Sequence, residues 1–169
     1  VSDTLDPLCS GSMDGSIDLT LSGGYSPYAY LWSDSSVLSD RTGLGGQVYS
    51  VSVTDSVGCA LSETYSLVWP SELLAEIQGL DSLLCYGDIA SNYSVMVSGG
   101  TSPYTYAWST GDSVSSLPSL GAGFYVVTVE DAQGCIKADT MDIYQPDSLE
   151  VITSKQDISC YGASDGTID

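Results

Sequence analysis

The chain repeats itself at a spacing of 76 residues, and this repeat constrains the fold more than any other feature. Cys9 and Cys59 recur as Cys85 and Cys135. Residues 23–59 align with residues 99–135 without a gap and share 17 of 37 positions. A third copy begins at Cys160. Solenoid repeats measure only about 20–50 residues and need neighbours to bury a core. A unit of this length therefore predicts a small self-contained domain.

Apolar side chains occupy every second position in short segments of each copy. The segments are residues 17–21, 28–32 and 49–53 in the first copy, and 93–97, 104–108 and 125–129 in the second. Turns rich in Gly, Pro and Asp separate them, and no segment has a sustained helical period. Alternation is typical of antiparallel strands that bury one face. The sequence predicts an all-β chain of two-sheet sandwiches.

Prolines mark the joins between copies. Pro70 and Pro146 each end a strand-like run, and new runs start at Leu73 and Leu149. Proline fixes φ and interrupts sheet pairing. We predict three parts, which are a first repeat at residues 1–70, a second at 71–146, and the opening strands of a third at 147–169. Neither join is rich in Gly and Ser, so a semi-rigid rod is expected.

Charge and composition exclude several functions. Lys and Arg total 3, Asp and Glu total 22, and His is absent, which gives a net charge of −19. Nucleic-acid binding needs a basic surface, and Ser-His-Asp catalysis or a His-bearing metal site needs His. Hydrophobic residues make up 43% of the chain, enough for a packed core. The sequence contains no apolar run of about 18 residues, so membrane insertion is not expected. No signal-peptide pattern follows Val1, so the chain is expected to be part of a longer protein.

Five cysteines predict disulfides in an oxidising compartment. The simplest pairing lies within each repeat, Cys9 with Cys59 and Cys85 with Cys135. In an immunoglobulin-like strand order, however, these partners would sit at opposite ends of a sandwich. A pairing between repeats, Cys9 with Cys135, therefore stays open, and so do free thiols. Cys160 has no partner in this scheme.

The aromatic residues could belong to the core or could form a ligand-binding surface. Trp32, Trp108, Tyr30 and Tyr106 occupy every second position of their segments and are predicted to be core residues, rather than a platform for stacking on sugars. Trp69 falls at a join and is expected to pack between units.

Aspartates could bind Ca²⁺ through their oxygens, and the candidates are Asp14, Asp18, Asp55, Asp131, Asp165 and Asp169. Asp beside Gly more often shapes a turn, and no EF-hand loop is present. No cofactor is therefore expected, with Ca²⁺ as the alternative.

These motifs together resemble the SprB-type repeat of the giant cell-surface adhesins of gliding bacteria. The matching elements are Cys-x-Gly at 9–11, Asp-Gly-x-Ile at 14–17, Gly-Gly-x-x-Pro-Tyr-x-Tyr-x-Trp-Ser at 23–33, and Tyr-x-Val-x-Val-x-Asp-x-x-Gly-Cys at 49–59. The second copy departs early, because Asp88-Ile89-Ala90 follows Cys85-Tyr86-Gly87. The resemblance implies tandem immunoglobulin-like (PKD-like) β-sandwich domains in a rod-like array, type IX secretion, and movement along the cell surface.

We therefore expect a structural and adhesive repeat segment of a very large extracellular filament, and not an enzyme. Its expected partners are neighbouring repeats of the same chain and a surface polysaccharide. The alternatives are a carbohydrate-binding module and a passive stalk stiffened by Ca²⁺. The expected location is the cell surface, on a filament attached to the outer membrane.

Overall fold

The computed structural model describes residues 2–157 and 159–168, and all regular elements in this part of the chain are β-strands. Each named strand pairs antiparallel with its neighbours. The described residues include no helix of the length and apolarity needed to cross a membrane. The predicted all-β class is confirmed.

Two three-stranded sheets form the first sandwich. One sheet has the order β1 (Ser2–Leu5), β2 (Gly15–Leu19) and β4 (Arg41–Leu44), and the other has the order β3 (Ala29–Trp32), β5 (Val48–Thr54) and β6 (Ala60–Ser66). Their inner faces enclose a core of Ile17, Trp32, Leu44, Tyr49, Val51, Val53 and Leu67. The alternating apolar positions of the sequence supply all of these residues except Leu44 and Leu67.

The second sandwich repeats the same plan. One sheet has the order β10 (Ser116–Leu120), β8 (Ala90–Ser98) and β7 (Leu74–Gln78), and the other has the order β12 (Ile136–Ile143), β11 (Gly123–Glu130) and β9 (Thr105–Trp108). Its separate core contains Ile77, Leu83, Ala90, Tyr93, Val95, Trp108, Leu117, Leu120, Val127, Val129 and Ile143. An extended stretch then leads to a short pair, β13 (Lys155–Gln156) and β14 (Thr167–Ile168).

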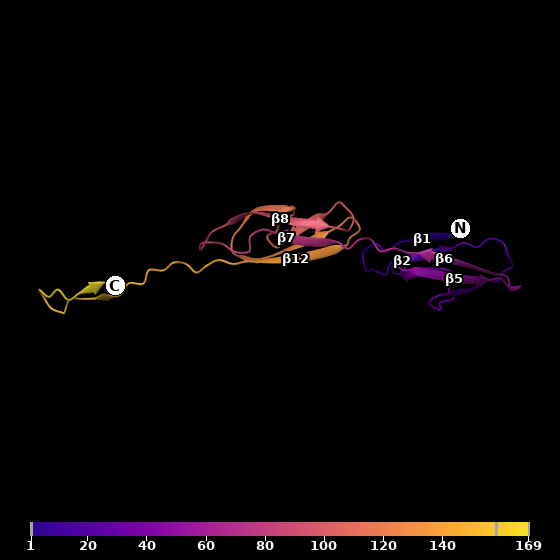
Figure 1. The fold of residues 1–169 in the computed structure, drawn as a ribbon, viewed down its shortest axis with the longest axis horizontal. Helices are drawn as coiled ribbons and strands as arrows, with labels where there is room; N and C mark the ends of the chain where they lie inside the picture. The colour runs from indigo at the N-terminus through magenta and orange to yellow at the C-terminus, as the bar shows by residue number, and fades with distance from the viewer. Residues whose placement is uncertain (1, 158, 169) are drawn as a thin grey trace.

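The two sandwiches lie end to end along one axis, and the C-terminal stretch continues in the same direction (Figure 1). Strand β12 runs lengthwise along the second sandwich toward that stretch (Figure 1). The fold is thus a rod-like array of tandem immunoglobulin-like β-sandwiches.

The repeated aromatic residues take equivalent places in the two cores. Trp32 and Trp108 are 2% and 4% exposed, and their indole Nε1–H groups donate to the carbonyl O of Leu38 at 2.8 Å and of Val114 at 2.9 Å. A buried indole thus keeps its polar group satisfied. The tyrosines two residues earlier, predicted as core, are only half-buried and pack against the core from its border.

Candidate functional site: a disulfide-bridged junction

The first cysteine of each copy opens a tight turn. In the first copy the N–H of Ser12 donates to the Cys9 carbonyl O at 3.1 Å, and Gly11 has a φ of 78°. Side chains rarely adopt that left-handed conformation, which explains the glycine of the Cys-x-Gly motif. The same turn recurs at Cys85 and Cys160. Each copy therefore presents its first cysteine from the same local structure.

Asp14 stabilises the first of these turns. Its Oδ1 accepts the N–H of Leu8 at 3.1 Å and the hydroxyl of Ser12 at 2.5 Å. The Ser12 hydroxyl lowers the pKa of the Asp14 carboxyl below its usual value, and the Leu8 N–H acts in the same direction. Asp165 accepts the N–H of Ser159 in the third copy. These contacts give the aspartate of the Asp-Gly pair a turn-forming role.

The second cysteine of the second sandwich follows a turn that is built around Asp131. Its Oδ1 accepts the N–H groups of Gln133 and Cys135, each at 2.9 Å, and its Oδ2 accepts the N–H of Thr101 at 2.7 Å. Only 6% of Asp131 is exposed. Burial acts to raise the pKa of this carboxyl, but the N–H donors, with Cys135 foremost, together outweigh it and hold the pKa below its usual value. Asp131 thereby fixes the position of Cys135.

Asp55 forms the same turn in the first sandwich. Its carboxylate accepts the N–H groups of Cys59 at 2.8 Å, Val57 at 3.0 Å and Tyr25 at 3.2 Å. The Cys59 N–H is the main cause that lowers the pKa of Asp55. Asp55 is more exposed than Asp131, and Cys59 is exposed. The two turns thus share their geometry and differ in what covers them.

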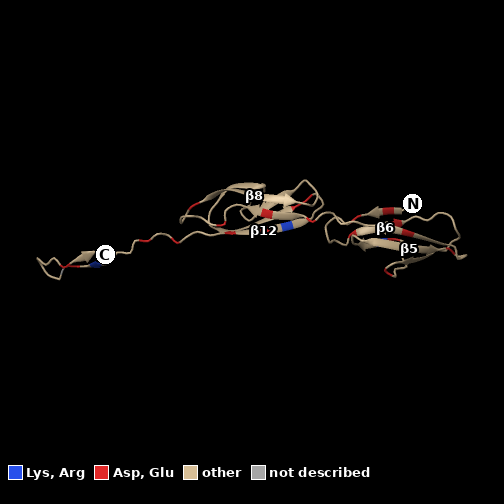
Figure 2. Cartoon of the chain, viewed as in Figure 1, with Lys and Arg blue, Asp and Glu red and all other residues tan. Residues whose placement is uncertain are grey.

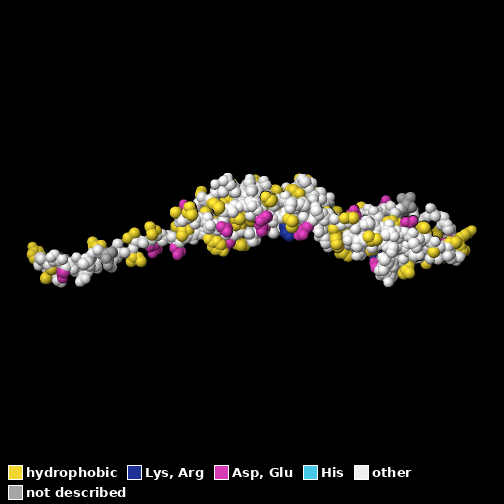
Figure 3. Space-filling model, in the orientation of Figure 1, with side chains coloured by type: hydrophobic (Ala, Val, Ile, Leu, Met, Phe, Trp, Pro, Cys, Tyr) yellow, Lys and Arg dark blue, Asp and Glu magenta, His cyan; other side chains and the backbone are white. Residues whose placement is uncertain are grey.

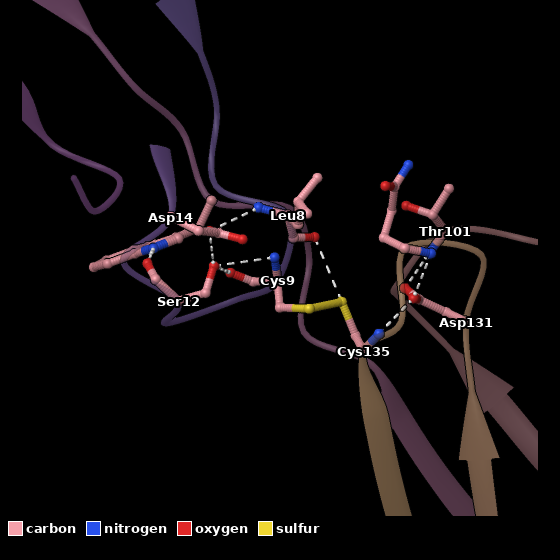
Figure 4. Close-up of a disulfide and its surroundings, with 9 residues drawn as sticks. Leu8, Cys9, Ser12, Asp14, Thr101, Asp131 and Cys135 are labelled. Atoms are coloured by element: carbon pink, nitrogen blue, oxygen red, sulfur yellow. Dashed lines mark hydrogen bonds between the residues drawn. A yellow bond between two sulfur atoms is a disulfide. The ribbon is translucent and has the colours of Figure 1, made fainter. Parts of the chain in front are cut away.

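One disulfide joins the sandwiches, and it connects Cys9 to Cys135 (Figure 4). Their Cα atoms lie 5.6 Å apart across a sequence separation of 126 residues. The Sγ of Cys135 lies 3.4 Å from the carbonyl O of Leu8. A disulfide sulfur carries no proton, so this is a packing contact. The bridge links the Cys-x-Gly turn of one repeat to the Asp-x-x-Gly-Cys turn of the next.

This pairing corrects the within-repeat pairing that the sequence favoured. Cys59 stands just before β6, whereas Leu67, just after β6, lies beside Gly15 near the Cys9 turn. Seven strand residues span about 23 Å, far beyond the roughly 7 Å that a disulfide tolerates between Cα atoms. In the second sandwich β12 separates Cys135 from Gln145, whose side chain holds the Cys85 turn through the Gly87 N–H. Cys59, Cys85 and Cys160 are free thiols.

Trp69 anchors the connecting chain to the first sandwich. Its indole Nε1–H donates to the Ser12 carbonyl O at 2.9 Å, and its ring lies against Gly45 and Gly46. A Cβ on Gly46 would come within 2.8 Å of that ring, so the pair of glycines makes room for it. The N–H of Val68 also donates to Asp6. Trp69 was expected to pack between units, and it instead packs on the first.

The next residues anchor the chain to the second sandwich. The N–H of Gly100 donates to the Ser71 carbonyl O at 3.0 Å, and Leu73 is only 5% exposed. A Cβ on Gly99 would lie 1.9 Å from the Glu72 carbonyl O, which requires glycine there. Lys137 and Glu72 form an exposed ion pair at 3.2 Å. This contact surface at Gly99 and Gly100 was not predicted from the sequence, although the Gly-Gly pair that forms it is present in both copies.

The junction therefore has two covalent links and two anchored chain segments, which restrict how the sandwiches move relative to each other. The junction suits mechanical coupling, since the carboxylates of Asp14 and Asp131 already accept hydrogen bonds from backbone N–H groups of their turns. Among the described residues, no group of three or more His, Cys, Asp or Glu side chains is placed to hold a metal ion.

This arrangement defines a class of protein: tandem immunoglobulin-like sandwiches that are cross-linked from one repeat to the next. The family model of the SprB repeat matches residues 1–37 and 82–113, segments that end at equivalent positions of the two copies. The match supports the resemblance carried by the motifs, because one segment of each copy is similar to the SprB repeat.

Other comparisons give more distant likenesses. No curated protein matches the chain. Among solved structures it is similar to the three N-terminal domains of the highly immunogenic outer capsid protein (Hoc) of bacteriophage RB49, with 15% identity and a TM-score of 0.46 over 86% of this chain. The chain spans 57% of that one. It is also similar to the amphioxus IgVJ-C2 molecule, with 12% identity and a TM-score of 0.36, over 79% of this chain and 97% of that one.

Proposed function

We propose that this chain is a non-catalytic structural segment of a very large adhesin filament outside the cell. It extends the filament from the cell surface and contributes to multivalent surface contacts during gliding, after type IX secretion. The observation that carries the proposal is the Cys9–Cys135 bridge between two sandwiches that have separate cores and lie end to end. A disulfide of this kind suits an oxidising, extracellular setting.

The bridge also shortens the path that tension takes through the chain. A pull from both ends passes along residues 2–9, crosses the disulfide, and continues along residues 135–146. Residues 10–134, which contain the first core and all of the second except Ile143, lie outside this path. Both path segments include strands that already run extended, β1 and β12. Unfolding of a sandwich under tension would therefore lengthen the filament very little, which suits a tether.

Charge supports an extended array. Acidic residues are spread along the whole length of the chain, and few basic residues accompany them (Figure 2). Like charges on successive repeats repel each other and oppose collapse of the filament onto itself. Repulsion also keeps neighbouring filaments soluble. Weak contacts with a surface can then add up over many repeats.

A polysaccharide is the proposed surface partner. Tyr25 and Tyr86 are 68% and 61% exposed, and exposed tyrosine rings can stack on sugars. A glycan array probed with the oxidised chain should show weak binding that strengthens when the chain is displayed in several copies. Absence of binding in both formats would leave a spacer with no sugar ligand of its own.

The proposed function is tested by shape and by location. Small-angle X-ray scattering of the oxidised chain should give an elongated particle, and a compact one would contradict the proposal. Antibodies against the chain should label intact cells of the organism that carries it. Labelling that needs permeabilised cells would place the protein inside and refute an adhesin role.

A further inference from the structure

Cys59 and Cys85 are the repeat equivalents of the two bridged cysteines. Cys59 corresponds to Cys135, and Cys85 corresponds to Cys9. Both are exposed thiols. We propose that each is half of a further bridge between repeats, so that a staggered series of disulfides joins every repeat to the next. Cys59 would bond to the first cysteine of a preceding repeat, and Cys85 to the second cysteine of a following one. The inference rests on the proposed function only in requiring more such repeats in series.

Cys59 already sits in the geometry that Cys135 has when bonded. The Asp55 carboxylate holds the Cys59 N–H at 2.8 Å, as Asp131 holds the Cys135 N–H at 2.9 Å. The carbonyl O of each cysteine accepts the N–H of its aspartate, at 2.9 Å and 3.0 Å. The turn therefore forms without a partner and is ready to receive one.

The surface beside Cys59 also has room for a neighbouring repeat. A hollow of about 180 Å³ lies there, lined in part by Leu21, Gly24, Tyr28 and Asp55. In the second sandwich the equivalent glycine, Gly100, bonds to Ser71 and lies against Leu73. The observed junction therefore shows what fits the hollow: the segment that leaves a preceding repeat after its proline. Its leucine would fill the hollow, and its Cys-x-Gly turn would reach Cys59.

At the other end, Cys85 is presented by the same turn as Cys9. The N–H of Asp88 donates to the Cys85 carbonyl O at 3.3 Å, and Gly87 has a φ of 77°. The side chain of Asp88 accepts the Cys85 N–H at 3.2 Å, the role that Ser12 plays for Cys9. The turn is thus preserved although the second copy lacks the Asp-Gly pair.

Formation of each bridge needs an oxidant, and a small-molecule disulfide such as oxidised glutathione suffices. One cysteine thiolate attacks a sulfur of glutathione disulfide, which forms a mixed disulfide and releases one glutathione thiolate. The second cysteine thiolate then attacks the protein sulfur and releases the other. Two protein thiols lose two electrons and two protons in total, and one glutathione disulfide becomes two glutathione thiols.

The staggered pattern would create two interleaved covalent paths along the filament. From Cys135 the chain runs 25 residues to Cys160, the first cysteine of the next bridge on the same path. Fully extended, 25 residues reach about 85 Å. The uncrosslinked route from Cys9 to Cys160 has 151 residues and would reach about 510 Å. The series would therefore limit extension of the whole filament, beyond the single junction seen here.

The test is a tandem chain in which residues 1–159 are followed directly by residues 9–169 of a second copy. This fusion keeps the 25-residue spacing between Cys135 and the next first cysteine. After refolding with reduced and oxidised glutathione, non-reducing peptide mapping should link Cys85 to Cys59 of the second copy. The fusion has nine cysteines, and three thiols should remain. Five thiols, or a bridge within one repeat, would overturn the proposal.

Two serine variants of the fusion serve as matched controls. Cys85→Ser should free Cys59 of the second copy and leave four thiols, while both Cys9–Cys135 bridges persist. Cys59→Ser in the first copy should leave the new bridge intact and only two thiols. Since Cys59 and Cys85 are exposed, neither change should prevent folding, which circular dichroism would check. Failure of this test would leave the shape and labelling of the chain, and so the proposed function, unaffected.

Discussion

The segment that leaves the first sandwich and the segment that leaves the second have related sequences but different surroundings. Leu67 and Ile143 are both buried, at 2% and 1% exposed, so each sandwich ends in the same way. Beyond the proline the two segments differ. Leu73 is 5% exposed in the observed junction, whereas Leu149 is 98% exposed. The exposed side chains of the C-terminal stretch are visible as hydrophobic groups along a thin part of the molecule (Figure 3).

This difference shows that the receiving sandwich gives the connecting segment its structure. Burying a leucine side chain stabilises the fold by about 1.5–3 kcal/mol, and that stabilisation requires a surface such as the one at Gly99 and Gly100. The connector is thus held at both ends: by Trp69 on the sandwich it leaves and by Leu73 on the sandwich it enters.

Reduction of the disulfide should have the largest effect on this junction. The covalent path between residues 2 and 145 comprises about 17 residue steps when oxidised and about 143 when reduced. Single-molecule stretching should therefore show an extended length that is roughly eight times greater after reduction. The Cys9→Ser/Cys135→Ser double variant should match the reduced chain, and should lose about 5 kcal/mol of unfolding free energy in urea by the loop-entropy model. Equal extension with and without reductant would contradict the assigned bridge.

Alanine substitution at two equivalent glycines should distinguish the glycine pair that the connector covers, at Gly99, from the uncovered pair at Gly23. Gly23 and Gly99 have φ values of 81° and 69°, so alanine costs about 1 kcal/mol at either position. A Cβ on Gly23 meets nothing within 4 Å, whereas one on Gly99 collides with the Glu72 backbone. Gly99→Ala should therefore lose about 1–3 kcal/mol more than Gly23→Ala in urea unfolding. Equal losses of unfolding free energy would mean that the connector does not pack against Gly99 in solution.

Trp69 and Gln145 hold equivalent places, and their removal should test the anchor on the departing side. Trp69→Ala removes a half-exposed indole and its bond to Ser12, for an expected loss of about 2 kcal/mol. Gln145→Ala removes one exposed bond to the Gly87 N–H, for an expected loss of about 0.5 kcal/mol. The distance distribution from small-angle X-ray scattering should broaden for Trp69→Ala and not for Gln145→Ala. A rigid rod that survives this change would show that the disulfide suffices for rigidity.

The sequence predicted those parts of the fold that depend on local pattern. Alternation at residues 49–53 and 125–129 falls within β5 and β11, and the predicted core tryptophans, Trp32 and Trp108, are buried. Strands β4 and β10 escaped prediction, because they lack alternation and β10 contains Pro118. Such a strand is stabilised by its neighbour rather than by its own pattern, and β10 is indeed an edge strand.

The disulfide pairing needed three-dimensional information. Equal spacing of the cysteines fits pairing within repeats as well as between them, and only the length of β6 and β12 decides which ends meet. The burial of Leu73 likewise depends on a surface contributed by residues 99–100. The Asp-x-x-Gly-Cys motif, in contrast, is local, and in both sandwiches its aspartate accepts the N–H groups of the residues two and four positions later.

The aspartates of these two turns provide the smallest and most specific test. The pKa of each folded carboxyl lies below the value of about 3.9 that holds in the unfolded chain. Their contribution to stability is therefore complete above about pH 4 and is lost as the pH falls through the folded pKa. Asp131→Asn places an amide group against a backbone donor and should lower the urea midpoint at pH 7, with the deficit vanishing in acid. Asp55→Asn should show the same pH dependence with a smaller deficit, because water can reach its exposed donors. Equal deficits at pH 7 would mean that burial of the turn at the junction does not strengthen the carboxylate's hold on its cysteine. A deficit that persists in acid would mean that the carboxylate charge is not its cause.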